Sequence, residues 1–301
     1  MTLSLLSIGT LAYDTIETVH ERRENVLGGS ATYFSLAACL YGGLAIVGVV
    51  GEDFEERDVE LLRARGVDLA GLEVARGKTF RWTGRYEADG NTRTTLATHL
   101  NVFEHFDPKV PMAHRNVRFL FLANAAPAVQ AKALAQIVRP EFTMLDTMNL
   151  WIGIAREELL HLVRRVDALI LNDEEARMLT GENNLLRAAT KALGLGPRLI
   201  VLKKGEHGAF LISRGGRFAI PSYPVEEVVD PTGAGDSFAG GFMGYLASQG
   251  NVEPATLRRA MLHGTATASY CVEGFGVEAL ARASRAAVDK RCSEILSLVS
   301  V

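Results

Sequence analysis

Residues 229–241 read Val229-Asp230-Pro231-Thr232-Gly233-Ala234-Gly235-Asp236-Ser237-Phe238-Ala239-Gly240-Gly241, and an apolar, helix-forming run covers residues 238–247. Gly233 and Gly235 allow a tight turn and a close backbone approach to a ligand, because neither has a Cβ atom. A helix that begins here points its free N–H groups and the positive end of its dipole at the turn. Such an arrangement binds phosphate oxygens. The stretch therefore predicts a phosphate-binding turn at the start of a helix.

The carboxylate of Asp236 is unusual in such a turn, because it would repel a phosphate that is only bound. It is consistent with a base that takes the proton of a hydroxyl attacking the phosphate. Two other interpretations apply to the same residues. The glycine spacing loosely matches a dinucleotide-binding turn, and an Asp in the first turn of a helix commonly serves as a structural cap. An acid inside a dinucleotide turn would crowd the pyrophosphate, so phosphotransfer is favoured.

The composition is that of a globular protein, and the length allows one large α/β domain or one domain with a smaller appendage. The chain has 301 residues, of which 48% are hydrophobic and 22% charged, and its formal net charge is −3. This charge gives no sign of a nucleic-acid-binding surface, which is usually basic. The apolar run over residues 36–50 is interrupted by glycines and is shorter than the ~20 residues that a membrane helix needs. We expect neither a nucleic acid nor a membrane as partner.

Cysteine usage and the first residues indicate the compartment. Cys39, Cys271 and Cys292 are too few and too scattered for a disulfide framework or a metal site. The first thirteen residues lack the basic start of a secretory signal. Both observations predict a cytoplasmic protein.

Short apolar runs alternate with helix-like stretches along most of the chain. The predicted strands cover residues 3–8, 45–50, 119–122, 142–145, 168–171 and 199–202, and the predicted helices cover residues 55–65, 128–138, 157–166 and 185–193. Such alternation is typical of a parallel sheet with helices on both faces. We expect an α/β fold with a doubly wound, mostly parallel sheet.

Two segments do not follow this alternation. Residues 15–27 are polar, and residues 78–99 alternate apolar and polar side chains on both sides of an Asp89-Gly90 turn. The second pattern predicts a β-hairpin outside the main sheet. We expect a small β lid, contributed by residues 14–27 and 78–103, on a single domain that spans residues 1–301.

Residues 229–241 resemble the second signature of the ribokinase (PfkB) family of carbohydrate and nucleoside kinases, which runs roughly D-T-x-G-A-G-D-x-F-x-x-G; Pro231 stands where many members have Thr. The family's first signature is similar to Gly28-Gly29-Ser30-Ala31 and to Gly48-x-x-Gly51-x-Asp53. Tyr33 replaces an Asn that commonly contacts substrate in the family. The resemblance covers almost the whole chain and implies a doubly wound kinase whose β lid closes over the acceptor.

The resemblance assigns the chemistry to the second signature. It implies that Asp236 is the catalytic base and that the backbone of Gly233, Ala234 and Gly235 forms an anion hole for the transferred phosphoryl group. It also implies that Asp230 lies near the phosphates and the cation.

Asn172-Asp173-Glu174-Glu175 resembles the N-x-x-E motif of the family. This resemblance implies that Asn172 and Glu175 help to place Mg²⁺, together with Asp230. The chemistry is suitable, because Mg²⁺ prefers oxygen ligands and keeps several waters. An Asn followed three residues later by a Glu is also close to a helix capping box, and both interpretations can hold together.

The resemblance also implies residues for the nucleotide. Lys203 would meet a phosphate, Gly205 would let the backbone approach ATP, and Thr232 and Gly264 complete the predicted ATP-binding set. The Asn that many members have near the adenine is missing or displaced in this late helix, and we expect His263 there to pack or cap.

The acceptor pocket is predicted from a second set of residues. Asp14 matches a carboxylate that holds substrate hydroxyls in the family, and Gly28 and Gly29 match a close backbone approach to the same ligand. Asn101 and Asn124 are further candidates for this pocket.

The resulting prediction is an ATP-dependent, Mg²⁺-requiring kinase that phosphorylates a hydroxymethyl group of a sugar or sugar-like small molecule. A nucleoside kinase of the same family is one alternative, since Tyr33 and the lid aromatics Phe80 and Trp82 could offer a stacking surface to a base. A non-catalytic ligand-binding relative is another, although such a protein has no need of Asp236. The resemblance also implies that two copies can pair through their lids.

Overall fold

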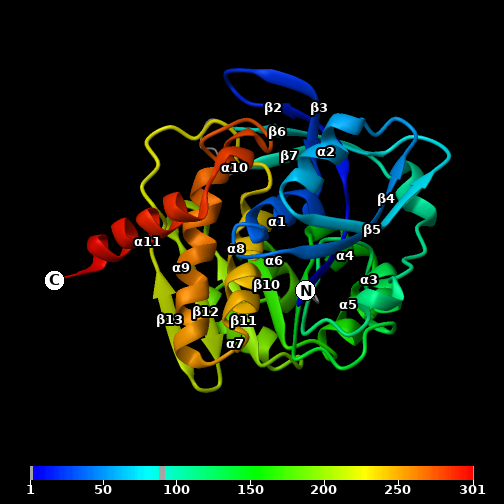
Figure 1. The fold of residues 1–301 in the computed structure, drawn as a ribbon. Coiled ribbons are helices and arrows are strands. Elements are labelled where there is room, and N and C mark those ends of the chain that lie inside the picture. The colour runs from blue at the N-terminus through cyan, green and yellow to red at the C-terminus, as the bar shows by residue number, and fades with distance from the viewer. Residues whose placement is uncertain (1–2, 88–91, 301) are drawn as a thin grey trace.

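The computed structural model describes residues 3–87 and 92–300, so the predicted Asp89-Gly90 turn lies outside the described residues. A nine-stranded sheet forms the centre of the molecule, and a four-stranded sheet lies beyond one of its ends (Figure 1). The large sheet contains β1 (Leu5–Ile8), β4 (Leu44–Gly51), β5 (Val67–Ala75), β8 (Phe119–Leu122), β9 (Phe142–Asp146), β10 (Ala168–Asn172), β11 (Leu199–Lys203), β12 (Ala209–Ser213) and β13 (Gly216–Ile220).

The strand order of the large sheet is β13-β12-β11-β10-β9-β8-β1-β4-β5. The strands from β5 to β11 in this order pair in parallel, and β12 and β13 extend the sheet as antiparallel strands. The chain winds outward from β1 to β5 and then returns to β8 on the other side of β1. The predicted doubly wound, mostly parallel sheet is confirmed. Ligands of such sheets bind beyond the carboxyl ends of the strands, near the point where the winding reverses.

Helices cover both faces of this sheet. The first face carries α1 (Ser30–Ala38), α2 (Glu56–Ala64), α8 (Ala234–Gln249), α9 (Pro254–Cys271), α10 (Glu278–Arg282) and α11 (Arg285–Val299). The second face carries α3 (Pro127–Leu134), α4 (Asn149–Ile154), α5 (Arg156–Val163), α6 (Asp173–Thr180) and α7 (Leu185–Leu193). Among the described helices, none is long and apolar enough to cross a membrane.

Strand β8 shows why the central strands are apolar throughout. Phe119 and Phe121 belong to the core of the first face, whereas Leu120 and Leu122 belong to the core of the second face. Successive side chains of a strand point to opposite faces, so a strand covered on both sides has no polar face. This burial is the origin of the short apolar runs in the sequence.

The four-stranded sheet has the order β3-β2-β6-β7. It contains β2 (Ala12–Glu17), β3 (Arg22–Gly28), β6 (Phe80–Tyr86) and β7 (Arg93–His99). β2 and β6 pair in parallel, and each has an antiparallel partner in β3 or β7. A small apolar cluster of Ile16, Tyr86 and Phe275 joins this sheet to the body. The sheet is built from the two segments predicted for a lid; its role as a lid and the extent of the domain remain predictions.

Candidate active site

Helix α8 begins directly at the glycines of the signature. Gly233 is its N-cap with φ of 76°, and Asp236 lies in its first turn. The helix starts at Ala234, earlier than predicted. Gly240, Gly241 and Gly244 inside it allow close packing against α1 and α9. The Ala234 N–H donates to the Pro231 carbonyl oxygen at 3.2 Å. The N–H groups of Gly233 and Gly235 are therefore the better placed donors of the predicted anion hole.

The turn before α8 is fixed by Asp230, which is completely buried. Its Oδ1 accepts the Thr232 N–H at 2.9 Å, and its Oδ2 accepts the Gly276 N–H at 2.8 Å. The Thr232 hydroxyl donates to Tyr86 Oη at 3.2 Å, and Cys271 Sγ donates to the Thr232 carbonyl at 3.3 Å. These contacts hold the turn before α8, and each Asp230 oxygen keeps a second lone pair. The role of Asp230 at the cation and the contact of Thr232 with ATP remain predictions.

Three polar residues end neighbouring strands at the same edge of the sheet. Asp146 ends β9, Asn172 ends β10 and Lys203 ends β11, and Asn172 is directly opposite Lys203 in the sheet. Lys203 Nζ lies 3.9 Å from Asp146 Oδ1. A Cβ atom on Gly235 would lie 2.8 Å from the same Nζ, so the ammonium group sits against the start of α8. Sequence reasoning did not find Asp146, although an acid that ends a buried strand beside Asn172 is a usable signal.

The predicted capping box at the start of α6 is confirmed. Glu175 N–H donates to Asn172 Oδ1 at 2.8 Å, and Asn172 N–H donates to Glu175 Oε2 at 2.7 Å. The described part of the chain holds no group of three His, Cys, Asp or Glu side chains suited to a metal. Mg²⁺ does not require one, because it binds through one or two carboxylates and keeps several waters. The second carboxylate oxygen of Glu175 fits such a contact.

The charged groups at this edge of the sheet shift one another's pKa values. Burial and the nearby Asp146 carboxylate raise the pKa of Asp236 above its usual range, against the opposite effect of Lys203 and Arg93. Burial also raises the pKa of Glu175. For Lys203, burial opposes the charged form, but the carboxylates of Asp146, Glu175 and Asp236 outweigh it and raise its pKa. Lys203 therefore stays charged at neutral pH, and Asp236 is a better proton acceptor than an exposed Asp.

Three of the predicted acceptor residues lie close together. Asp14 lies in β2 and is almost completely buried, and a Cβ atom on Gly28 would clash with its carboxylate. Gly29 is the N-cap of α1 with φ of 94°. Burial raises the pKa of Asp14 to about 8, and the charges of Asp230 and Asp236 add to this effect. The structure thus brings Asp14, Gly28 and Gly29 together within the electrostatic reach of Asp236.

Residues 2–283 match the family described as pfkB family carbohydrate kinase, which is nearly the whole chain. The chain belongs to this family. It is therefore a kinase of the ribokinase type and a phosphotransferase.

Relatives of this pfkB-family kinase act on different acceptors. It is 30% identical to a cytidine kinase of Thermococcus kodakarensis over 80% of this chain and 87% of the relative. It is 29% identical to a 2-dehydro-3-deoxygluconokinase of Thermoproteus tenax over 79% of this chain and 77% of the relative. Its fold is similar to a Burkholderia thailandensis nucleoside kinase in complex with inosine, with a TM-score of 0.75, 20% identity and 97% coverage of both chains.

The two asparagines predicted for the acceptor pocket differ in position. Asn124 Oδ1 accepts the Trp151 indole N–H at 3.1 Å. The backbone carbonyl oxygen of Asn124 accepts the Ser30 hydroxyl at 3.2 Å, which places Asn124 beside Gly29. Asn101 begins a 3-10 helix and donates to the Thr79 carbonyl at 2.9 Å. Asn124 therefore lies next to the predicted pocket of the pfkB-family kinase, whereas the hydrogen bond of Asn101 holds the chain beside the lid.

The glycines predicted for ATP lie in different environments. Gly205 is exposed, with φ of 52°, at the start of a 3-10 helix after Lys203. Gly264 is buried inside α9, and a Cβ atom there would lie 2.8 Å from the Phe238 carbonyl oxygen. Gly264 thus allows α8 and α9 to approach closely. Contacts of both glycines with ATP remain predictions.

The aromatic side chains near the lid are packed. Phe80 meets Phe103 edge to face, with ring centroids 6.0 Å apart. Trp82 donates its indole N–H to Thr95 at 3.3 Å and lies under the Arg93 guanidinium. Tyr33 is 1% exposed beneath Gly233. Tyr33 is therefore closed to a nucleobase, whereas Phe80 and Trp82 are half-buried and keep part of their surfaces exposed.

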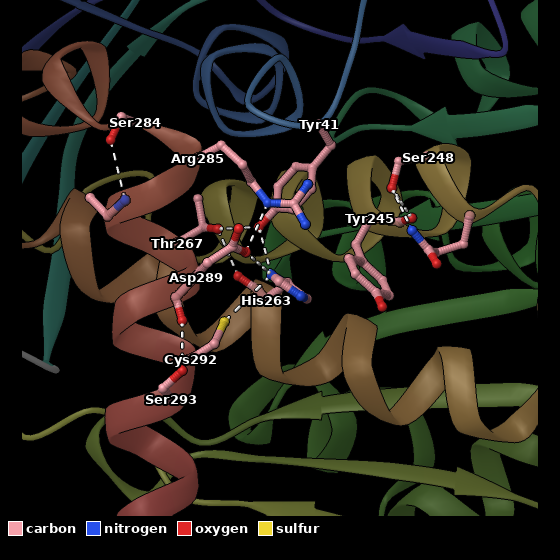
Figure 2. Close-up of polar contacts among 12 residues, drawn as sticks. Tyr41, Tyr245, Ser248, His263, Thr267, Ser284, Arg285, Asp289, Cys292 and Ser293 are labelled. Carbon is pink, nitrogen blue, oxygen red and sulfur yellow. Dashed lines mark hydrogen bonds and ion pairs between the residues drawn. The ribbon is translucent and has the colours of Figure 1, made fainter.

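His263, in α9, packs against α8 and α11 and against Tyr41 from the turn after α1, as Figure 2 shows. Its ring stacks on Tyr245 with centroids 4.1 Å apart. Its Nδ1 lies 3.2 Å from Tyr41 Oη and 3.4 Å from Cys292 Sγ. The side chain is buried, so the predicted packing role is confirmed.

Burial lowers the pKa of His263 to about 4, whereas an unfolded His titrates near pH ~6.5. Between these values the unfolded chain binds more protons, so the free energy of unfolding should decrease as the pH falls from about 6.5 toward 4. Replacing His263 by Gln should reduce this pH dependence, measured as the thermal midpoint between pH 7 and pH 5. The exposed His207→Gln is the control. An unchanged pH dependence in His263→Gln would contradict the assignment.

Proposed function

We propose that this kinase transfers the γ-phosphoryl group of ATP to a hydroxymethyl group of a sugar or sugar-like molecule, with Asp236 as general base. The observation that carries the proposal is the position of Asp236 in the first turn of α8, directly after Gly233 and Gly235 and beside the Lys203 ammonium. A carboxylate weakens simple phosphate binding at a helix start. It is useful there when a proton must leave an attacking hydroxyl.

The transfer step follows from this arrangement. The acceptor hydroxyl gives its proton to Asp236 while its oxygen forms a bond to the γ-phosphorus. The bond from that phosphorus to the β–γ bridging oxygen breaks, and ADP leaves with the electron pair. The Gly233 and Gly235 N–H groups and the Lys203 ammonium stabilise the charge of the phosphoryl oxygens. Mg²⁺, bound through Glu175 and water, would neutralise further phosphate charge.

The acceptor would lie between Asp14 and Asp236. The buried Asp14 carboxylate, with Gly28 and Gly29 close to it, can accept hydrogen bonds from sugar hydroxyls. The four-stranded sheet would close over the acceptor and exclude water, which limits ATP hydrolysis. Pairing of two copies through this sheet and the cytoplasmic location remain predictions.

A nucleoside is the second candidate acceptor. The cytidine kinase that is 30% identical to this chain favours it. Contacts already made by the aromatic side chains favour a free sugar, because Tyr33 is buried, Phe80 packs on Phe103 and the Arg93 guanidinium lies over Trp82. Both candidates carry a hydroxymethyl group that can accept the phosphoryl group.

The test is ADP release from ATP–Mg²⁺ with a panel of pentoses, hexoses, sugar phosphates, polyols and nucleosides. We expect release that depends on one acceptor class, with controls that omit the acceptor or chelate Mg²⁺. Binding of ATP without acceptor-dependent release on any member of the panel would contradict the proposal and favour a ligand-binding relative. Release with nucleosides alone would select the second candidate.

A further inference from the structure

Lys203 and Asp146 form an ion pair with an unusual geometry. Both side chains are largely buried, with 17% and 7% of their surfaces exposed. The two charged atoms are 3.9 Å apart, which is too long for a hydrogen bond. Asp146 Oδ1 has no hydrogen-bond donor among the described residues. The pair is therefore held by charge alone, and the three donors of the ammonium stay available to a further group.

A buried ion pair stabilises a fold only when its hydrogen bonds are well made, because desolvation of the two charges is costly. The exposed pair of Asp107 and Lys132 closes to 2.7 Å even though solvent can satisfy both groups. The longer separation of the buried pair does not fit a purely structural role. It fits a lysine that is kept in place for a ligand.

The direction in which Lys203 points identifies that ligand. Its Nζ lies where a Cβ atom on Gly235 would be only 2.8 Å away. The ammonium group is thus beside the first turn of α8, where backbone N–H groups already favour an anion. The charged groups that act on Lys203 are Asp146 from β9, Glu175 from α6, Asp236 from α8 and Arg93 from β7.

We propose that Asp146 is a positioning residue, which holds the Lys203 ammonium at the start of α8 so that it donates to the transferred phosphoryl group. This role rests on the phosphotransfer proposed above. Asp146 does not touch the phosphoryl group, because its carboxylate would repel it; its effect passes through Lys203. The ends of β9 and β11 fix the distance between the two residues, since both strands flank β10 in the sheet.

A double-mutant cycle tests the proposal. Lys203→Met should lower kcat on the order of 10²–10³-fold, as the loss of a donor to a developing charge does. Asp146→Asn should lower kcat about 10–100-fold with little increase in the KM for ATP, because it misplaces a group that acts in the transition state. In the Lys203→Met background, Asp146→Asn should cause less than about a twofold further loss. Losses that multiply would overturn the proposal, because Asp146 would then act independently of Lys203.

Control variants distinguish a misplaced Lys203 from loss of folded protein as the cause of a lower kcat. Asp107→Asn removes the carboxylate of the exposed Asp–Lys pair and should leave kcat unchanged. Asp146→Asn leaves a buried cation without a partner, so its folded fraction must be measured by thermal unfolding. Asp146→Glu keeps the charge and serves if Asp146→Asn does not fold. It should also lower kcat, because the longer side chain displaces the ammonium group, and wild-type kcat in Asp146→Glu would count against positioning.

A second readout does not depend on turnover. Reductive ¹³C-methylation of the lysines allows the Lys203 ammonium to be titrated by NMR, with Lys203→Met to assign its signal. Loss of the Asp146 charge should lower the pKa of Lys203 in the ligand-free protein. An unchanged Lys203 titration in Asp146→Asn would overturn the pairing. Absence of ADP release from the wild-type protein would instead overturn the phosphotransfer on which the role rests, so the two failures are distinguishable.

Discussion

Replacing Asp236 by Asn should lower acceptor-dependent ADP release about 10²–10⁴-fold, which is the usual effect of losing a well-placed general base. The amide keeps the size of the side chain but cannot accept the acceptor proton. Because the loss lies in the chemical step, the KM values for ATP and acceptor should change little, and steady-state kinetics will show this. In the wild type, the rate should fall on the acid side of the raised pKa of Asp236, where the carboxylate becomes protonated.

The fold should tolerate this substitution. A carboxylate with a raised pKa in the folded state is destabilising at neutral pH, so its removal should not lower the thermal midpoint. Asp173→Asn is a matched control, because Asp173 also lies in the first turn of a helix but forms an exposed ion pair with Arg177. An exposed ion pair contributes little to the free energy of unfolding, so Asp173→Asn should keep wild-type stability and activity. Wild-type turnover in Asp236→Asn would contradict the role of Asp236 as a base.

Replacing Gly233 by Ala should abolish most of the activity and destabilise the fold. The added Cβ would clash with the ring of the buried Tyr33, and such overpacking costs about 1–3 kcal/mol. The left-handed conformation, with φ of 76°, is also unfavourable for Ala. Relief of the clash would move the turn that carries the anion hole. Thermal unfolding and ADP release measure the two effects.

Gly181 offers the matched control for this substitution. It has a similar φ of 72° at the end of α6, but no atom lies within 4 Å of the position of its Cβ. Gly181→Ala therefore carries the conformational cost without the clash and should retain activity. A smaller residue at position 33, as in Tyr33→Leu, should partly restore Gly233→Ala. If Gly233→Ala and Gly181→Ala behave alike, the contact with Tyr33 is not what requires glycine.

Local features of this fold were predictable from the sequence, whereas long-range ones were not. The central strands are predicted because burial on both faces leaves continuous apolar runs. β5 and β13 were not predicted, because these edge strands mix exposed and buried positions; β12, which lies between β13 and β11, was also not predicted. The capping box of Asn172 and Glu175 lies within a single turn of chain, so its residues are visible together.

The parts of the site that depend on strand order could not be predicted in this way. Asp146 lies beside Lys203 only because β9 and β11 flank β10. An acid at the end of a buried strand is a local signal, but no local pattern pairs it with Lys203. Similarly, no local pattern shows that the N–H of Gly276, which lies far along the chain, donates to the Asp230 carboxylate. Tyr33 differs from the family pattern, and only the structure shows that its ring lies beneath Gly233.

The parallel pairing of β2 and β6 has a consequence for how this protein can be altered. The two central strands of the small sheet enter it from separate parts of the chain, and each brings its own hairpin partner. Excision of either hairpin would leave two strands, which are rarely stable alone. The small sheet is therefore not a single continuous segment, and it cannot be exchanged between relatives by joining the chain at only two points. Transplanting it requires both segments, and their register fixes where all four junctions must lie.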